Sequence, residues 1–285
     1  MWREVVELAR VKNIALAAIT VPLGAHLGLE GQWDSNSLGL VALQTASVGC
    51  FIVAGNIFND VSDCAIDAVA RPDKPIPSGR ISLTQAKHLA IEFSLLSLVL
   101  MGIGAYLSSD PIAIIAIWSL ASILMYTYDM GLQTKKMGFV GNIAISLMVG
   151  AVILYGAATI GKVNTPLAFY AAGVAFFANL GREIIKDCED MESDKDRNTL
   201  PMRVGLAKAR MFGYVSLLCA LIVLYLPHWL GPLEFDQLLF QAPAMLALIT
   251  TNGPLQKGQD HAAQQRVRVG MLLGLLGFAA AVSLY

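Results

Sequence analysis

The chain has 285 residues, of which 56% are hydrophobic and only 14% are charged, and its formal net charge is −1. Soluble domains carry about 25% charged residues, so this composition excludes an ordinary soluble protein and makes the lipid bilayer the expected solvent. The near-zero net charge gives no sign of a nucleic-acid partner. We expect membrane lipid around the chain, with no nucleic acid and no obligate protein partner.

Nine apolar stretches along the chain are candidate transmembrane helices. A hydrocarbon core about 30 Å thick requires roughly 20 apolar residues per helix. The stretches lie near 13–29, 37–58, 88–107, 111–128, 138–159, 164–184, 210–231, 236–251 and 268–285. Arg3, Arg10 and Lys12 precede the first stretch, but no convincing cleavage site follows it, so we interpret it as a span. The sequence predicts an all-α polytopic membrane protein with one domain over residues 1–285.

The basic residues are distributed unequally between the two predicted sides of the membrane. With nine spans and a cytoplasmic N-terminus, 19 of the 20 lysines and arginines fall on the inner side, and Lys162 falls outside. This bias predicts a multi-pass protein of the cell membrane whose N-terminus is cytoplasmic and whose C-terminus lies outside. The bias also supports the span count, because a missed span would move basic residues to the opposite side of the membrane and remove the bias.

Two long polar connections lie on the predicted inner side. The first runs near 60–87, and its prolines end the preceding helix and stiffen the loop. Ser82 and Gln85 then form the pattern of a capping box, which predicts the start of the third span. The second connection runs near 186–209. Because the outer connections are short, we expect function on the inner face.

One spacing of polar residues occurs twice, at the inner ends of the second and sixth spans. The first segment contains Asn56, Asn59, Asp60, Asp63 and Asp67, and the second, offset by 127 residues, contains Glu183, Lys186, Asp187, Asp190 and Asp194. At about 100° per residue, the five positions of each segment project within an arc of roughly 100°. Each helix therefore presents an acidic stripe at its cytoplasmic end. The repeat indicates two related halves or convergence on one chemical task.

Carboxylates at a membrane edge need a compensating partner, because an Asp at a helix centre costs about 2.5–3.5 kcal/mol to insert. Divalent cations are the natural partner, since Mg²⁺ binds hard carboxylate oxygens and bridges them to substrate phosphates. If the carboxylates were simply solvated on helices that extend into the cytosol, the repeated spacing would have no explanation. The two stripes are therefore predicted to hold Mg²⁺ around a diphosphate.

Basic residues interleave with the acidic stripes, as a diphosphate site requires. They are Arg71, Lys74 and Arg80 on the first connection, Arg182 and Lys186 on the second motif helix, and Lys135 and Lys136 after the fourth span. Cations near a leaving phosphate neutralise the charge that develops on it. Any one of them can equally be a topology signal or a lipid headgroup contact. Lys186 differs, because it takes the place in the second stripe that Asn59 takes in the first.

Two motifs resemble the signatures of the UbiA superfamily of intramembrane prenyltransferases. The first is Asn59-Asp60-x-x-Asp63-x-x-x-Asp67 followed by Arg71, Pro72, Lys74, Pro75 and Gly79-Arg80, and the second is Lys186-Asp187-x-x-Asp190-x-x-x-Asp194. Within the superfamily, three stretches are similar to the archaeal digeranylgeranylglyceryl phosphate synthases. They are Arg10-x-x-Asn13 with Ala17-Ala18, Lys136-Met137-Gly138-Phe139-Val140-Gly141-Asn142, and Gly181-Arg182-Glu183-Ile184-Ile185-Lys186-Asp187. Val11 departs from the pattern, in which a proline is usual.

The resemblance implies a helical bundle around a central cavity that opens sideways to lipid and is capped by the connections near 60–87 and 186–209. It implies that Asp63, Asp67, Asp190 and Asp194 bind Mg²⁺, and that Asn59 and Lys186 join them as catalytic residues. The residues that it implies around the cofactor and diphosphate are Asp60, Asp187, Arg71, Lys74, Arg80, Tyr128, Lys135, Lys136 and Arg182. Tyr126 is an alternative to Tyr128, because the spacing around Asp129-Met130-Gly131 is loose.

We therefore expect Mg²⁺-dependent transfer of a geranylgeranyl group from geranylgeranyl diphosphate to the hydroxyl of geranylgeranylglyceryl phosphate, which forms the second ether bond of archaeal-type lipids. Mg²⁺ and basic residues would stabilise the departing diphosphate while the allylic C1 gains carbocation character. A lipid-buried cavity would exclude the water that quenches the cation. Asn13 and Asn142 are candidates for orienting the acceptor, and helix–helix hydrogen bonding is the alternative role.

Three other functions compete with this expectation. An aromatic acceptor, as in the attachment of quinone, haem or chlorophyll tails, would use the same site. A CDP-alcohol phosphotransferase also uses membrane aspartates with Mg²⁺, but neither acidic stripe contains its D-G-x-x-A-R core. A transporter would place charges at the midplane and show inverted repeats of broken helices, whereas these carboxylates cluster at the inner edge.

Overall fold

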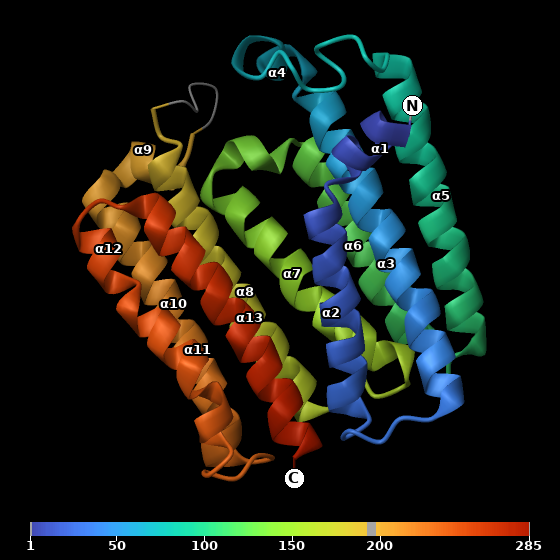
Figure 1. Ribbon diagram of the computed structural model, residues 1–285, viewed down its shortest axis with the longest axis vertical. Helices are drawn as coiled ribbons and strands as arrows, with labels where there is room; N and C mark the ends of the chain where they lie inside the picture. The colour runs from blue at the N-terminus through green and yellow to red at the C-terminus, as the bar shows by residue number, and fades with distance from the viewer. Residues whose placement is uncertain (1, 193–197, 285) are drawn as a thin grey trace.

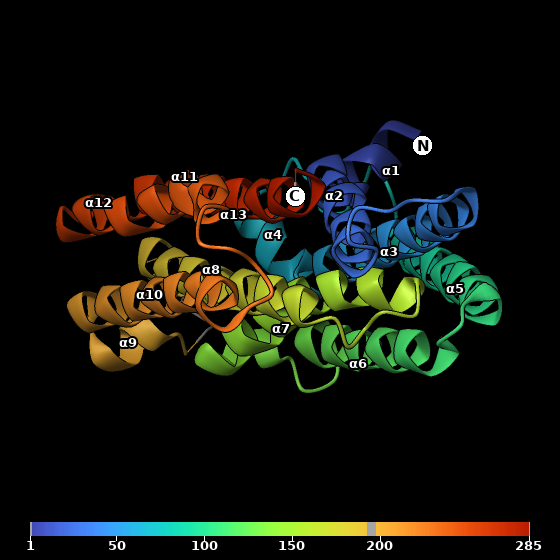
Figure 2. The same ribbon diagram turned by 90° about the horizontal axis from the view of Figure 1, so that it is seen from below.

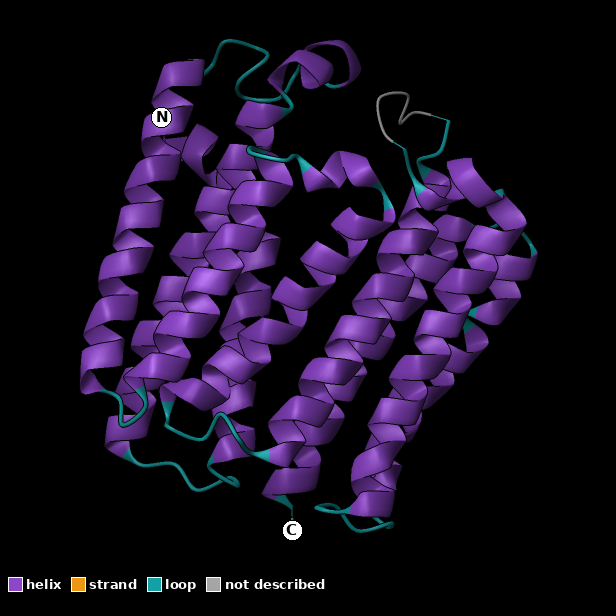
Figure 3. Ribbon diagram, turned by 180° about the vertical axis from the view of Figure 1, so that it is seen from behind, coloured by secondary structure: helices purple, strands orange, loops and turns teal. Residues whose placement is uncertain are grey.

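The computed structural model describes residues 2–192 and 198–284. The side chains of Trp2, Lys12, Asn13, Leu16 and Ala17 lie outside that description. Every regular element within the described ranges is a helix, which confirms the predicted all-α class (Figure 3).

The helices run side by side as an elongated bundle (Figure 1). In chain order they are α1 Trp2–Ala9, α2 Val11–Gly28, α3 Ser35–Ser62, α4 Cys64–Ala70, α5 Leu83–Leu107, α6 Pro111–Asp129, the 3₁₀ helix η1 Thr134–Met137, α7 Phe139–Thr159, α8 Pro166–Glu189, α9 Leu200–Val204, α10 Leu206–Leu230, α11 Leu238–Thr250, α12 Asn252–Gln256 and α13 Asp260–Ser283.

Seven helical segments of the described chain are long and apolar enough to cross a membrane. They are α3, α5, α6, α7, α10, α13 and the segment Leu238–Gln256 that joins α11 to α12. The two other predicted spans are helices in the same bundle. The apolar part of α2 is confined to Ala18–Gly28, and α8 carries the charged second motif in its last turns. The predicted helix positions are confirmed, and the count of nine spans stays a prediction.

Local sequence signals explain where several helices begin. Ser82 Oγ accepts a hydrogen bond from the Gln85 backbone N–H at 3.2 Å, and Gln85 Oε1 accepts one from the Ser82 N–H at 3.0 Å. The predicted capping box at the start of α5 is thereby confirmed. α13 begins at Asp260, earlier than its apolar stretch, because Arg266 and Arg268 project from its exposed side.

Sequence periodicity did not predict α1, α9, α12 or η1, and it did not separate α4 from the helix before it. The longest of them, α1, has only eight residues. A segment that short fills less than the window of about 11–18 residues in which a helical period can be recognised.

Backbone contact between α2 and α7 fixes the centre of the bundle. A methyl group at Gly24 would lie 1.9 Å from the Ile153 carbonyl oxygen, and one at Gly156 would lie 2.1 Å from the Val21 carbonyl oxygen. Small residues allow membrane helices to approach this closely. In the end-on view, α2 and α7 lie between a group made of α3, α5 and α6 and a group made of α8, α10, α11 and α13 (Figure 2).

Both predicted connections lie at the same end of the bundle. α1, α4 and α9 all occupy this end, as does the N-terminus, whereas the C-terminus lies at the opposite end (Figure 1). Asp63 follows the end of α3, and Asp190 follows the end of α8. The bundle therefore carries both acidic motifs to one end.

Candidate active site

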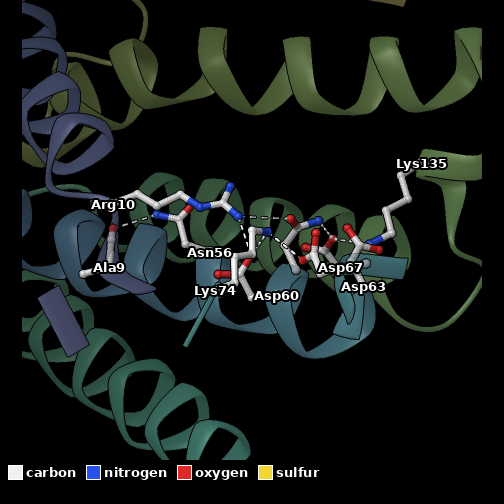
Figure 4. A network of polar contacts seen from close by, with 10 residues as sticks. Ala9, Arg10, Asn56, Asp60, Asp63, Asp67, Lys74 and Lys135 are labelled. Atoms are coloured by element: carbon white, nitrogen blue, oxygen red, sulfur yellow. Dashed lines mark hydrogen bonds and ion pairs between the residues drawn. The ribbon is translucent and has the colours of Figure 1, made fainter. Parts of the chain in front are cut away.

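The first acidic stripe runs from α3 into α4 (Figure 4). The sequence predicted one continuous helix through Asp67, but α3 ends at Ser62 and Asp63 separates it from α4. The Asp63 N–H donates to the Asn59 carbonyl at 2.9 Å, and the Asp67 N–H donates to the Asp63 carbonyl at 2.8 Å. Because helical hydrogen bonding continues across the break, the carboxylates remain in line.

Lys74 bridges two carboxylates of this stripe, those of Asp60 and Asp67. Its Nζ lies 3.0 Å from Asp60 Oδ1 and 2.6 Å from Asp67 Oδ2. Asp60 and Asp67 are both buried, each with 6% of its surface exposed. Buried carboxylates must be paired, and Lys74, on the proline-rich connection, supplies the charge. This contact holds the connection against α3 and α4.

Lys135 enters the stripe from η1 on the other side. Its Nζ lies 2.7 Å from Asp63 Oδ1 and 3.3 Å from Asp129 Oδ1. The Lys135 side chain is only 2% exposed, so it is a buried cation between two carboxylates. Lys136, its neighbour in η1, is exposed. Of these two lysines, the structure places Lys135 in the site.

Asp129, the last residue of α6, belongs to the site and was missed in the sequence. It is 4% exposed, accepts a hydrogen bond from Asn59 Nδ2 at 2.8 Å, and pairs with Lys135. Its backbone carbonyl accepts from Ser62 Oγ at 2.8 Å. Asp129 thus fixes which end of the Asn59 amide faces the stripe. An acidic residue at the inner end of a span was the signal that could have identified it.

Arg10 is a second residue of the site to which the sequence assigned no role there. Its Nη2 pairs with Asp60 Oδ1 and lies 3.5 Å from Asn59 Oδ1. Arg10 stands between α1 and α2 with φ 51° and ψ 67°, the left-handed conformation. That conformation costs a non-glycine residue about 1–2 kcal/mol. The turn it makes directs the chain from α1 into α2 at the point where the guanidinium meets α3.

The second stripe ends with the same backbone geometry as the first. The Asp190 N–H donates to the Lys186 carbonyl at 2.9 Å, as Asp63 does to Asn59. Asp187 is 7% exposed and accepts a hydrogen bond from Asn142 Nδ2 of α7 at 2.8 Å. Lys186 and Asp190 are half-buried. Asp194, the predicted fourth metal ligand, lies outside the described residues.

The remaining predicted residues lie around these two clusters. Arg182 donates to Asn179 Oδ1 at 3.1 Å and pairs with Glu183. Arg71 is exposed, Tyr128 is half-buried, and Tyr126 is 60% exposed. The structure therefore joins Asn59, Asp60, Asp63, Asp67, Lys74 and Lys135 in one network, and it holds Arg182 within the second motif helix.

Arg80 anchors the connection near 60–87 to the N-terminal helix instead of entering the stripe. Its guanidinium donates to both carboxylate oxygens of Glu7 at 2.8 and 3.0 Å. This pair lowers the pKa of Glu7 and raises the pKa of Arg80. Arg80 therefore has a structural partner on α1 in this conformation.

The donor set fits magnesium and phosphate chemistry. Asn59, Asp63, Asp67 and Asp190 offer hard oxygen donors, which Mg²⁺ prefers. The ammonium groups of Lys135 and Lys74 lie beside Asp63 and Asp67, respectively, so positive charge is already present at both carboxylates. Within residues 2–192 and 198–284, no three acidic, histidine or cysteine side chains converge to hold a metal ion. Because Mg²⁺ usually keeps waters and substrate phosphates as ligands, single carboxylates from separate helices suffice.

Comparison with known proteins agrees with this arrangement. The model of the UbiA prenyltransferase family matches residues 17–276. Digeranylgeranylglyceryl phosphate synthase of Methanopyrus kandleri is 36% identical over 284 residues, which cover 98% of this chain and 99% of the relative.

Solved structures share the fold over the whole chain. A digeranylgeranylglyceryl phosphate synthase structure superposes with a TM-score of 0.81 at 27% identity, covering 100% of this chain and 99% of the other. A UbiA homolog from Archaeoglobus fulgidus bound to GPP and Mg²⁺ gives a TM-score of 0.72 at 16% identity, covering 99% of this chain and 100% of the other. With the family match over most of its length and this relative across nearly all of it, the chain belongs to the UbiA prenyltransferase family and is a multi-pass membrane prenyltransferase.

Proposed function

We propose that this prenyltransferase moves a geranylgeranyl group from geranylgeranyl diphosphate to the free hydroxyl of geranylgeranylglyceryl phosphate, in the synthesis of archaeal-type membrane lipids. The observation that carries the reaction class is the acidic stripe of α3 and α4, into which Lys74 and Lys135 project. The acceptor is supported by the 36% identity to a digeranylgeranylglyceryl phosphate synthase over nearly the full length of both chains.

Mg²⁺ is part of this proposal. Asp63, Asp67 and Asp190, with Asn59 beside them, would hold it, and Asp194 is proposed as a further ligand. When bound, Mg²⁺ supplies positive charge that neutralises the diphosphate as it leaves. The Archaeoglobus fulgidus homolog that shares this fold binds GPP and Mg²⁺, which supports the assignment.

The basic residues of the chain act on the same leaving group. In the reaction the C1–oxygen bond of the donor breaks and its electron pair leaves with the diphosphate. The acceptor hydroxyl oxygen then forms the ether bond and gives up its proton. Lys74 and Lys135, already held beside the stripe, are placed to stabilise the negative charge that collects on the diphosphate. Lys186, half-buried on α8, is proposed for the same task from the second motif.

Asp60, Asp129 and Asp187 act on other side chains of the site. Asp60 holds Arg10 and Lys74, and Asp129 holds Asn59 and Lys135. Asp187 binds Asn142. These contacts restrict the rotamers of the groups that face the substrate, so less ordering is needed when the substrate binds.

We also propose that the active site faces the cytoplasm, with the N-terminus on the same side and the C-terminus outside. The termini lie at opposite ends of the bundle, and both acidic motifs lie at the end that holds the N-terminus (Figure 1). The basic residues of α1, η1, α9 and the connection near 60–87 belong to that end, which the positive-inside rule places in the cytoplasm.

The test measures transfer of the labelled geranylgeranyl group from geranylgeranyl diphosphate to geranylgeranylglyceryl phosphate by the purified protein in detergent. Parallel reactions contain either Mg²⁺ or EDTA. Wild type should form the diether product only with Mg²⁺, and Asp63→Ala and Asp190→Ala should both abolish it. Leu120→Ala, at a lipid-facing position of α6 that is 54% exposed, is the matched control and should retain activity.

The other outcomes separate the parts of this proposal. Prenylation of aromatic acceptors in place of the glycerol lipid would overturn the acceptor and leave the site intact. Product formation that resists EDTA and both aspartate substitutions would overturn the assigned site.

A further inference from the structure

A surface groove lies between α2 and α3, beside the first acidic stripe. Its volume is about 580 Å³, within the range of about 300–1,000 Å³ typical of small-molecule sites. Its lining is almost entirely apolar and includes Ile14, Ala18 and Pro22 of α2 and Ala46, Gly49 and Val53 of α3. Ala18, Ala46 and Gly49 have small side chains or none, and they leave open the space in the groove that larger side chains would fill.

The lining of the groove ends at Ile14 on α2 and at Val53 on α3, about one turn short of the polar site. On α3, Asn56 and Asp60 follow Val53 at helical intervals of three and four residues, so they continue the groove-lining face. On the other wall, Arg10 precedes α2 by one residue and lies one turn before Ile14. Asn56 Nδ2 donates to the Ala9 carbonyl at 2.8 Å, which fastens the end of α1 to α3. The guanidinium of Arg10 therefore belongs to a residue about one helical turn beyond Ile14, which lines the groove.

Arg10 retains binding capacity in this position. Only Nη2 takes part in its described contacts, with Asp60 and Asn59, and the side chain is 38% exposed. Guanidinium groups bind phosphate through paired N–H donors. The remaining donors of Arg10 can thus meet a phosphate at the end of the groove.

The basic residues of the first motif meet its carboxylates at successive turns of the stripe. Arg10 contacts Asn59 and Asp60, nearer the middle of the membrane span, whereas Lys135 contacts Asp63 one turn further out. Lys74 reaches Asp67 a further turn along, and it also meets Asp60 at the same Oδ1 as Arg10. The proposed reaction brings together two lipids that each carry an anionic head and an isoprenoid chain. Arg10 at Asp60 and Lys135 at Asp63 give each head a cation of its own.

We propose that the groove between α2 and α3 binds the isoprenoid chain of the acceptor and that Arg10 binds the acceptor phosphate. The assignment of this occupant rests on the proposed function, because geranylgeranylglyceryl phosphate is the amphiphile that combines one such chain with a phosphate monoester. The lysines of the stripe remain for the donor diphosphate. The acceptor enters from the bilayer along the face of α2, without passing between the two acidic motifs.

The direct test is photolabelling in lipid nanodiscs with an acceptor analogue that carries a diazirine in its isoprenoid chain. The label should map to the peptides of α2 and α3 that line the groove, and excess unmodified acceptor should block it. Labelling confined to other helices, or labelling blocked by geranylgeranyl diphosphate and not by the acceptor, would overturn the groove assignment.

The phosphate contact is tested by comparing geranylgeranylglyceryl phosphate with geranylgeranylglycerol, which lacks the phosphate. Arg10→Gln should lower kcat/KM for the phosphorylated acceptor by about 10- to 100-fold, the value of a charged hydrogen bond, with a smaller change in KM for geranylgeranyl diphosphate. The preference for the phosphorylated acceptor should shrink by the same factor, and Arg10→Lys should restore part of it. An equal loss for both acceptors would show that Arg10 acts only through Asp60.

A pair of tryptophan substitutions tests the groove itself. Ala46→Trp fills it and should raise KM for the acceptor without changing KM for the donor. Ala116→Trp adds the same ring to an exposed position of α6 and should change neither. If Ala46→Trp does not affect acceptor KM, the chain lies elsewhere. These outcomes are separate from the proposed function, which fails only if wild type forms no diether lipid.

Discussion

The two acidic motifs share a backbone geometry, and side chains from different parts of the chain contact each of them. Asp63 caps α3 with φ −93° and ψ 6°, and Asp190 caps α8 with φ −85° and ψ 0°. In the first motif all three aspartates contact lysine or arginine side chains. In the second, Asp187 accepts from the neutral amide of Asn142. The repeated spacing thus sets the helix geometry, while partners from elsewhere in the chain hold the carboxylates.

The cations of the first motif have a consequence for binding order. A cation that approaches the first motif must compete with Lys74 and Lys135 for Asp63 and Asp67. The lysines released in this way become available to a diphosphate. If Mg²⁺ binds here as proposed, the first motif would favour the metal and the anionic substrate together over the metal alone.

The largest expected effect comes from making the same substitution at the equivalent position of each motif. Asp63→Asn and Asp190→Asn occupy equivalent helix ends, and each should lower kcat by about 10³-fold if both hold one diphosphate, because each removes charge at the reacting group. Single-turnover assays with labelled donor measure this. A tenfold or greater difference between the two variants would show that the halves are not equivalent in function.

Asp129→Ala should produce the next largest effect. It frees the Asn59 amide and removes one of the two carboxylates beside Lys135. Loss of a residue that orients a ligand costs about 10–100-fold in metal affinity, so we expect that increase in the Mg²⁺ concentration for half-maximal activity. Mn²⁺ binding followed by electron paramagnetic resonance should weaken in parallel. Unchanged Mn²⁺ binding would limit Asp129 to a structural role.

Asn142→Leu tests the neutral partner of the second motif. It leaves the buried Asp187 carboxylate without this hydrogen bond, which costs about 1–3 kcal/mol. Thermal unfolding in detergent should show a lower midpoint, and Asn142→Asp should lower it further by placing two carboxylates together. A stable leucine variant with full activity would show that Asp187 does not depend on α7.

Lys74→Gln should have a smaller effect. It should raise the affinity for Mn²⁺ and lower the affinity for geranylgeranyl diphosphate. Without its ammonium group, Asp60 and Asp67 lose one cation, so Mn²⁺ binding without substrate should tighten a few-fold, in the range of a partly exposed ion pair. KM for geranylgeranyl diphosphate should rise. If both affinities fall together, Lys74 serves only to hold the connection in place.

The smallest effect is expected from Glu7→Gln, which breaks the contact between α1 and Arg80. Arg80 lowers the pKa of Glu7 below its ordinary value of 4.5. The pair therefore stabilises the fold above that value, and its contribution is lost as pH falls through the lowered pKa. Thermal midpoints of wild type and variant should differ slightly at pH 7 and converge at low pH. If the difference in thermal midpoint persists at low pH, Glu7 stabilises the fold through packing and not through its charge.

The parts of the site that were predictable follow from helical periodicity. Spacing alone placed Asn59, Asp60, Asp63 and Asp67 on one face, and apolar runs located the helices that carry them. The long-range partners could not be inferred this way. Lys135 and Lys136 are adjacent in sequence, yet only the left-handed turn at Gln133 and the 3₁₀ helix that follows decide which one is buried. Arg10 likewise reaches Asp60 through a backbone conformation with no sequence signal.

The segment from Lys135 to Asn142 touches both motifs: its first residue pairs with Asp63 and its last binds Asp187. Between them, Gly138 has φ 59°, and a methyl group there would lie 2.3 Å from the Asn198 carbonyl oxygen. The segment therefore acts as a spacer of fixed length between the two half-sites. One inserted residue would rotate Asn142 by about 100° and shift it by about 1.5 Å, so the motifs cannot be exchanged between relatives without their spacer.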